Sequence, residues 1–282
     1  YSKLIMGAKD QEIWHYQWNA VYNKAYENIS DIKQIDPSRL NKFDGLVIGT
    51  DQTLNLKENK IAKFVPKNYT INTGLRGGHK FYVYLKDELD IRVKKQDINW
   101  YNGTDELNVI IYDSSEKLIG NFSIPDDGIN GTEKTIPRIQ EGGLRIEDIR
   151  EGVYIIEFMD FDGIIRELNI NSDKIVAVYQ VYLADSSVFF PDIEKPSRIY
   201  TNLSRRGEVA MKTWHAAALQ DVLVNNISYR INERVTETVV GIDYGINVIE
   251  SQKNDIIVSI PGYFAFSNYG YFEPFNHKIV PL

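Results

Sequence analysis

The feature that most constrains the fold is a regular succession of short β-type segments and turns that begins at Gly74. Residues 89–95 alternate apolar and polar side chains with a period of two, which is typical of a half-buried strand. Turn-forming residues recur at spacings of about 8 to 12 residues over roughly 110 residues, as they do in antiparallel sandwiches and not in strand–helix–strand units. The sequence therefore predicts a mainly β protein made of antiparallel β-sandwich domains.

Two hairpins are predicted in this region. Residues 107–113 and 117–124 flank a Ser-Ser-Glu turn, and residues 152–160 and 164–170 flank an Asp-Gly turn. Further strands are predicted at residues 79–85, 89–95 and 174–184. The chain has 18 Tyr and 12 Phe, and this abundance also favours strands, because aromatic side chains suit a pleated, half-buried surface.

The residues before Gly74 and after Pro191 have less regular patterns. A helical face is predicted within residues 10–29, a buried strand at residues 44–50 and a helix at residues 51–64. We expect a small mixed α/β segment over residues 1–73, a β-sandwich domain over residues 74–189 and a second β-rich domain over residues 190–282. Residues 211–219 are compatible with a helix or a strand. The aromatic stretch 262–275 either closes a sheet or forms an exposed adhesive surface.

Composition excludes several classes of function. The net charge of −7 argues against a partner bound through its phosphates, so we expect no nucleic acid. The absence of cysteine excludes disulfides, thiolate metal sites and cysteine nucleophiles. No stretch approaches the roughly 18 apolar residues of a membrane span, so none is predicted within this chain. Because the chain begins at Tyr1 without Met, we expect a removed segment upstream, and any signal peptide or anchor would lie there.

The clearest motif is the N-glycosylation sequon. It occurs seven times, at Asn28, Asn68, Asn102, Asn121, Asn130, Asn202 and Asn226, and never with Pro in its middle position. From the numbers of Asn, Ser and Thr, chance alone gives roughly two sequons. Because these residues also favour turns, a loop-rich β protein raises the count without any glycan. The excess nevertheless predicts N-linked glycans on some of these residues, and with them an extracellular, cell-surface location.

Signals for metal binding and catalysis are weak. The acidic turns at Asp126 and Asp127 and at Asp160 and Asp162 are compatible with calcium, but neither has the spacing of an EF-hand loop, and an ordinary turn is the alternative. We therefore expect no cofactor, with calcium as the exception that stays open. The four histidines form no close ligand pair, and His215 is predicted to be a packed strand residue.

No catalytic motif is present, so we expect that the protein is not an enzyme. A pair of carboxylates contributed by separate strands would leave no sequence motif, so a cell-surface hydrolase stays open as a third hypothesis. Exposed aromatic rings can stack on sugars, and the candidates are Trp100, Tyr101, Tyr263, Tyr269 and Tyr271. Packing in the core or at a strand edge is the favoured alternative for these five side chains.

Three segments carry a resemblance to a known group of proteins. Residues 75–128, which begin "LRGGHKFYVYL", residues 47–61 and residues 199–222 resemble uncharacterised, membrane-anchored surface proteins of small-genome archaea. The resemblance implies an envelope protein of S-layer or filament type, built from β-sandwiches and carrying N-glycans. It supplies no site residue.

These observations lead to two hypotheses of function. The first is a structural component of an extracellular envelope layer or surface filament. It would associate with copies of itself or with other envelope proteins through strand edges or aromatic patches, with N-linked glycans covering its outward face. The alternative is an extracellular β-sandwich module that binds carbohydrate or a partner protein.

Overall fold

The computed structural model describes residues 58–99, 105–129, 138–159, 162–185, 193–203 and 206–275, together with the backbone of four further strands near the ends of the chain. The chain forms two compact units. One comprises Tyr1–Lys60 and Glu273–Leu282, and the other comprises Ile61–Phe272. The domain boundaries predicted after residues 73 and 189 stay predictions.

The first unit contains a four-stranded sheet with the strand order β19-β3-β1-β2. Its strands are β1 (Ser2–Met6), β2 (Ile13–His15), β3 (Leu46–Thr50) and β19 (Ile279–Pro281). β1 is antiparallel to β2 and parallel to β3, which in turn is parallel to β19. β3 confirms the strand predicted at residues 44–50. β2 is a strand within the range 10–29, where a helical face was predicted, and the rest of that range lies outside the described residues.

The helix predicted at residues 51–64 is wrong in its described part, residues 58–64. Glu58 forms an isolated antiparallel bridge with Phe275, and the backbone amide of Asn59 donates a hydrogen bond to the carbonyl of Pro274 at 2.9 Å. Backbone groups that pair with a distant segment do not make the local hydrogen bonds of a helix. Residues 51–57 lie outside the described part of the chain.

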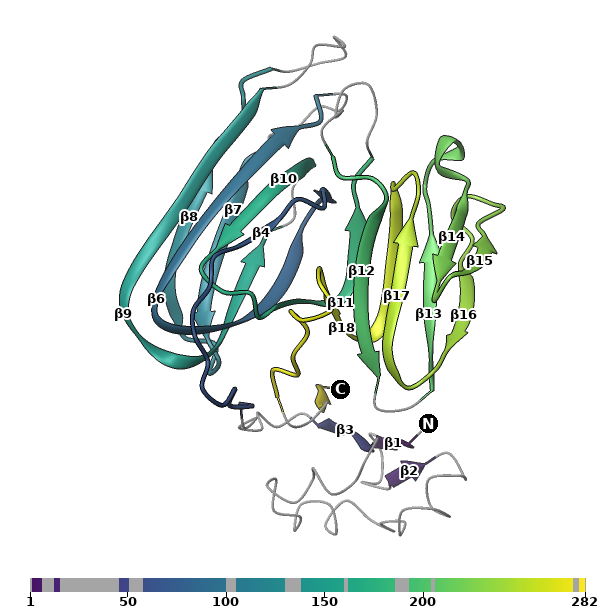
Figure 1. The fold of residues 1–282 in the computed structure, drawn as a ribbon, viewed down its shortest axis with the longest axis horizontal. Helices are drawn as coiled ribbons and strands as arrows, with labels where there is room; N and C mark the ends of the chain where they lie inside the picture. Colours follow the sequence, from purple (N-terminus) through teal and green to yellow (C-terminus); the bar gives the residue numbers. More distant parts are fainter. Residues whose placement is uncertain are drawn as a thin grey trace. The chain divides into compact units, whose positions relative to one another are not determined.

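The second unit is a set of 15 connected strands, all paired in antiparallel orientation (Figure 1). The strands are β4 (Tyr69–Ile71), β5 (Leu75–Arg76), β6 (His79–Asp97), β7 (Leu107–Asp113), β8 (Leu118–Ile124), β9 (Ile139–Phe158), β10 (Gly163–Ile170), β11 (Ile175–Leu183), β12 (Ser197–Leu203), β13 (Gly207–Lys212), β14 (Asp221–Val224), β15 (Ile227–Arg230), β16 (Thr238–Ile242), β17 (Gly245–Ser251) and β18 (Ile256–Ala265). The mainly β prediction is therefore confirmed.

Two long, bent strands organise this unit. β6 has 19 residues and β9 has 20, and they pair along almost their whole length while curving together (Figure 1). The register shifts around Asp87, which has a left-handed φ of 67°, and Asp148 opposite the bend has a φ of 57°. The first half of β6 pairs with β11, and the second half pairs with β10. The pair of β6 and β9 thus belongs to two sheets. The first sheet contains β11 beside the first half of β6, and the second sheet contains β10 beside its second half.

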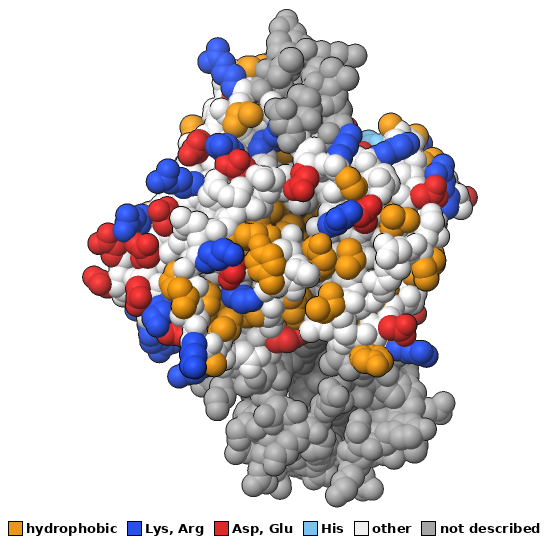
Figure 2. All heavy atoms as spheres, viewed as in Figure 1, with side chains coloured by type: hydrophobic (Ala, Val, Ile, Leu, Met, Phe, Trp, Pro, Cys, Tyr) orange, Lys and Arg blue, Asp and Glu red, His pale blue; other side chains and the backbone are white. Residues whose placement is uncertain are grey.

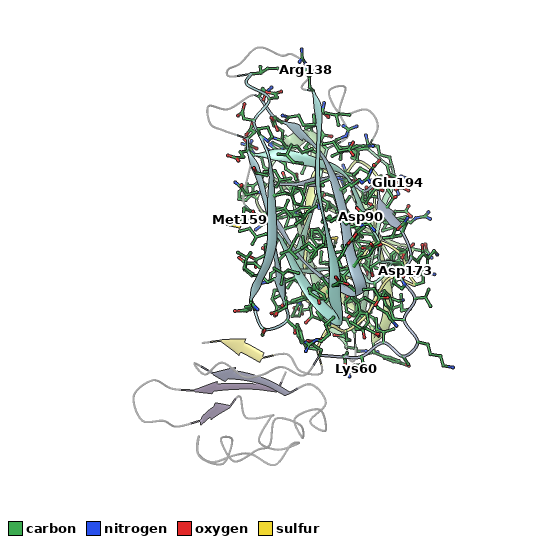
Figure 3. All side chains as sticks on the ribbon, turned by 90° about the vertical axis from the view of Figure 1, so that its left-hand side faces the viewer. Lys60, Asp90, Arg138, Met159, Asp173 and Glu194 are labelled. Atoms are coloured by element: carbon green, nitrogen blue, oxygen red, sulfur yellow. The ribbon has the colours of Figure 1, made fainter. Side chains whose placement is uncertain are left out.

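The core lies between the two sheets that this bend creates. Phe81, Val83 and Leu85 from the first half of β6, and Leu89, Ile91 and Val93 from its second half, are all at most 1% exposed. They belong to one buried apolar cluster, and side chains fill the space between the strands (Figure 3). Burial of each such side chain contributes about 1.5 to 3 kcal/mol, so the cluster is the main source of stability of this unit.

The second predicted hairpin is wrong. β9 and β10 are joined by the Asp-Gly turn but do not pair with each other, because β10 lies beside the second half of β6, whereas the end of β9 pairs with the first half of β6 and with β7. The first hairpin is confirmed as β7 and β8. The strands predicted at residues 79–85 and 89–95 are the two halves of the single strand β6.

β18 connects the two predicted β-rich segments. It pairs with β11 from Ile256 to Ala265, and with β13 and β12 on its other side. The aromatic stretch 262–275 therefore begins as part of a sheet, and Phe272 and Phe275 within it are buried. Residues 211–219 contain the end of β13 and the short 3-10 helix η2 (Ala216–Ala218). No helix in the described part of the chain is long and apolar enough to cross a membrane.

A pair of glycine substitutions tests the packing of β6 against β9. A Cβ atom on Gly143 would lie 2.4 Å from the backbone oxygen of Ile91, whereas a Cβ on Gly241 of β16 would meet nothing within 4 Å. Because a backbone atom cannot rotate away, we expect Gly143→Ala to lower the free energy of unfolding by about 1 to 3 kcal/mol. Gly241→Ala is the matched control and should be neutral or slightly stabilising. Chemical denaturation compares the two, and equal effects would contradict the packing described here.

Candidate functional site

Three of the four sequon asparagines that the structure describes are exposed. Asn68, Asn121 and Asn226 are exposed, whereas Asn202 on β12 is half-buried. Asn226 and its neighbour Asn225 have left-handed φ values of 65° and 51°, and form the tight turn between β14 and β15. Asn28, Asn102 and Asn130 lie outside the described residues.

Of the four sequon asparagines that the structure describes, three lie at edge strands, whereas Asn202 lies on β12, which pairs with β17 and β18. Within the described part of the chain, five strand segments pair with one neighbouring strand only: β4, β8, β15, β16 and the first half of β9. A sequon asparagine directly precedes β4 (Asn68), lies in β8 (Asn121) or directly precedes β15 (Asn226). The first half of β9 has exposed charged side chains, among them Glu141, Arg145 and Glu147. β16 has neither a sequon nor a charged residue.

β16 is also apolar on its open face. Val239 is 54% exposed, and the space beside Gly241 is open. The alternate residues Val240 and Ile242 are only 5% exposed and point into the core. The inner face of β16 is thus held in the core, whereas its outer edge has no charged residue or sequon. A strand edge of this kind favours pairing with another strand.

Of the three proposed sugar-stacking residues that the structure describes, only Tyr269 has an exposed side chain. Tyr263 is only 6% exposed and packs edge-on against Tyr82 with ring centroids 5.8 Å apart, so its face is not accessible. Tyr271 is half-buried, and its hydroxyl donates to the carbonyl of Asn202 at 3.0 Å. Tyr269 is 51% exposed. Trp100 and Tyr101 lie outside the described residues.

Tyr269 belongs to a small surface group of its own. Its ring meets that of Tyr69 edge-on at 6.2 Å, and the ammonium of Lys67 lies 5.4 Å from its centre. Figure 2 shows an apolar area in the middle of one face of the second unit, with charged side chains mostly around it. The Lys67 cation limits the free ring surface of Tyr269.

A shallow groove lies over the second half of β6 and the neighbouring strands β9 and β10. It consists of two adjoining depressions of about 460 and 520 Å³, both of which are lined by Asp90, Arg92 and Glu141. Lys94 and Glu167 form an ion pair of 2.9 Å within it, and Asn68 and Tyr69 line one end. The lining has charged side chains beside Leu144 and two glycines, which suits a hydroxyl-rich or ionic ligand better than a wholly apolar one.

An acidic cluster occupies the ends of β6 and β8. Asp97 is the last residue of β6, and Asp126 and Asp127 follow β8. One carboxylate oxygen from each of these three residues lies within 4.8 Å of the others. The Asp127 amide donates to Asp97 at 2.9 Å, and the amides of Asp105 and Gly128 donate to Asp126 at 2.9 and 2.6 Å. These backbone bonds fix the carboxylates in place.

Charge within the cluster is only partly compensated. The buried ammonium of Lys95 lies 2.6 Å from Asp97 and also donates to the carbonyl of Asp105. Burial, together with the carboxylates of Asp97, Asp162 and Asp126, raises the pKa of Asp105 to about 7. Backbone amides hold the pKa of Asp126 below its usual range. The ammonium of Lys95 is thus the single cation that the described structure places beside the carboxylates of this cluster.

The side-chain amide of Asn99 lies beside the acidic cluster. The Asn99 side chain is 2% exposed, and its nitrogen lies 3.1 and 3.3 Å from the two carboxylate oxygens of Asp127. Its amide oxygen is buried and has no hydrogen-bond partner in the described structure. An unpaired buried oxygen costs about 1 to 3 kcal/mol, so this position calls for a further electropositive group.

The acidic turns predicted as calcium candidates are thus separated. Asp126 and Asp127 come together with Asp97, whereas Asp162 lies 3.6 Å from the guanidinium of Arg76 and is not one of the three clustered ligands. Asp160 lies outside the described residues. Sequence reasoning missed Asp97. The signal was present, because the alternation that points Ile91 and Val93 inward also points residues 95 and 97 inward.

A second polar network lies near the start of β6. His79 is buried, and the amide of Tyr182 donates to its Nε2 at 3.2 Å while its Nδ1 donates to the carbonyl of Gly77 at 3.1 Å. Burial lowers the pKa of His79 to about 4, so the imidazole is neutral and structural. His215 lies after β13 and not in a strand, and its Nδ1 is 2.7 Å from the carboxylate of Asp255.

Comparison with known proteins gives little guidance. No family model and no curated protein matches the chain. A solved structure described as "Crystal structure of dimeric latent PorU from Porphyromonas gingivalis" has 9% sequence identity and a TM-score of 0.22, over 80% of this chain and 24% of that chain. A similarity at this level carries no conclusion about function.

The neutral state of His79 predicts a pH dependence of stability. Its folded pKa of about 4 is below the ordinary value of 6.5, so the stability is complete above pH 6.5 and falls as the pH drops toward 4. The loss amounts to about 3 kcal/mol between about pH 8 and pH 4. We expect His79→Gln to remove this part of the pH dependence, measured by denaturant unfolding at several pH values. Parallel profiles for the two proteins would contradict the assignment.

Exposure predicts which sequons carry glycans. Because an acceptor asparagine must reach the solvent, we expect occupancy at Asn68, Asn121 and Asn226 to exceed occupancy at the half-buried Asn202. Glycopeptide mass spectrometry of native material measures all four. Unmodified asparagine at every sequon would remove the surface-protein interpretation, and preferential modification of Asn202 would contradict the exposures described here.

Proposed function

We propose that this protein is a structural, self-associating component of an extracellular layer or surface filament, and that β16 is the strand through which two copies pair. The observation that carries the proposal is the open edge of β16, which exposes Val239 and has no charge, no proline and no sequon. Proteins usually protect such edges with charges, prolines or covering segments. An edge left without these devices is suited to a partner strand.

The other edges support this choice. Glycans attached at Asn68, Asn121 or Asn226 would add bulk beside β4, β8 and β15, and charged residues protect the first half of β9. Glycosylation would therefore prevent pairing at several edges and leave β16 free. In this arrangement the same modification that keeps the outward surface soluble also directs strand pairing to one edge. This pairing joins two copies into a dimer, which would be the unit from which a layer or filament is built.

The sequence of β16 fits pairing with itself. Two copies related by a twofold axis at Val240 would form an antiparallel pair in which Thr238 of one copy faces Ile242 of the other, and Val239 faces Gly241. No charged residue within the strand opposes a like charge in this register. Val240 and Ile242 would keep their places in the core, and the main-chain hydrogen bonds would continue the sheet across both copies.

A charge on the open face of β16 tests the proposal. Val239→Lys should weaken the dimer by about tenfold or more, because lysine on an edge strand opposes pairing and the two ammonium groups would lie near each other on one face of the paired strands. Val65→Lys is the matched control, since Val65 is 75% exposed and lies outside the strands, and it should leave association unchanged. Analytical ultracentrifugation of both proteins measures the association constant.

Cross-linking tests the register. The chain has no cysteine, so Val239→Cys combined with Gly241→Cys introduces the only thiols, and these face each other across the proposed pair. We expect a disulfide-linked dimer on a non-reducing gel after mild oxidation. A strictly monomeric wild-type protein at high concentration would exclude self-association, whereas dimers without the cross-link would show that another surface is used.

The groove over β6, β9 and β10 favours a second candidate function, a module that binds an extracellular carbohydrate or charged ligand. Its polar lining supplies the hydrogen-bonding groups that such a ligand requires. The state of Asn68 distinguishes the two functions, because Asn68 lines the same groove and a glycan attached to it would obstruct ligand binding there. Binding on a glycan array that is lost in Arg92→Ala would favour the binding module, and a blank array would count against it.

A further inference from the structure

The carboxylates at the end of β6 have the spacing of ligands around a single cation. Calcium bonds to oxygen at about 2.3 to 2.6 Å, so two ligands on opposite sides of the ion lie at most about 5 Å apart. The three carboxylate oxygens of Asp97, Asp126 and Asp127 all lie within 4.8 Å of one another. Magnesium gives up its water ligands reluctantly and is seldom bound by a site made wholly of protein ligands, so calcium suits this group better.

The ammonium of Lys95 does not satisfy the cluster. Lys95 bonds to Asp97 and to the carbonyl of Asp105, whereas the hydrogen bonds of Asp126 and Asp127 come from backbone amides and from Asn99. Each carboxylate oxygen that accepts one hydrogen bond keeps a second lone pair. Several carboxylates therefore retain charge and ligand capacity that a single ammonium cannot use.

Asn99 supplies an independent observation. Its side chain is 98% buried, its amide contacts the carboxylate of Asp127, and its amide oxygen has no partner in the described structure. An amide oxygen is one of the neutral ligands that calcium accepts beside carboxylates. A cation that contacted this buried oxygen as well as the three carboxylates would supply its missing partner.

We propose that Asp97, Asp126, Asp127 and the amide oxygen of Asn99 form a calcium-binding site at the end of β6. The site lies where β6 and β8 end and where residue 105 leads into β7, so the ion would join three strand ends of the second unit. Its role is to hold these strand ends together. The proposal is independent of self-association through β16.

Thermal unfolding with and without calcium is the first test. After removal of metal with a chelator, calcium at roughly 30 times its dissociation constant should raise the melting temperature of the full chain by about 5 °C. Affinities of extracellular calcium modules are of the order of 0.1 to 1 mM, so millimolar calcium is appropriate. Magnesium at the same concentration should have little effect. Absence of a calcium effect would overturn the proposal.

Variants locate the site. Asp126→Asn combined with Asp127→Asn changes two half-buried carboxylates without changing their shape, and should bind one calcium ion fewer per chain in equilibrium dialysis and lose the rise in melting temperature. Asp221→Asn is the matched control, because Asp221 is exposed and forms only a surface ion pair of 3.3 Å with Arg230. It should behave as the wild type.

Circular dichroism without calcium confirms that the variants are folded. If the double variant does not fold, the single change Asp126→Asn decides the question, with an expected loss of at least about tenfold in affinity for calcium. Unchanged affinity in the single variant, or unchanged stoichiometry in the folded double variant, would show that calcium binds elsewhere and would overturn the site.

Discussion

The bend shared by β6 and β9 is the constraint on which the rest of the second unit depends. A straight antiparallel pair of this length would expose both of its faces. At Asp87 and Asp148 the backbone takes a left-handed conformation, which costs about 1 to 2 kcal/mol per residue. The apolar side chains of both halves of β6 lie in one buried cluster, and their burial exceeds this cost. The positions of β10, β11 and β7 follow, because each pairs with one half of β6 or β9.

The acidic cluster is a consequence of the same strand. β6 keeps its alternation beyond Val93, so Lys95 and Asp97 continue on the inner face although they are charged. Both side chains are completely buried, and a buried charge requires a partner. The partners come from the turn after β8 and from the residues before β7, which the two sheets bring to this end of the sandwich. Sheet geometry thus holds the polar groups in place.

Unpaired strand edges are the other consequence of an open sandwich. Among the described strands, one side is unpaired in β4, β8, β15, β16 and the first half of β9, and most of these edges have a sequon or charged residues. β16 has neither, and its contrast with the other edges supports self-association better than any single exposed aromatic ring. The tyrosines give less support, because Tyr263 is buried and Tyr271 is bonded to the backbone.

The sequence by itself determined where most strands lie, the hairpin of β7 and β8, and the candidate glycan positions. These features depend on local alternation and turn chemistry, which act over a few residues. Only the tertiary structure decided that residues 79–97 form one bent strand, that β9 and β10 lie apart, and that Asp97 joins Asp126 and Asp127. Alternation assigns each side chain to a face of its strand. It does not select the partner strand, which depends on pairing between segments far apart in the chain.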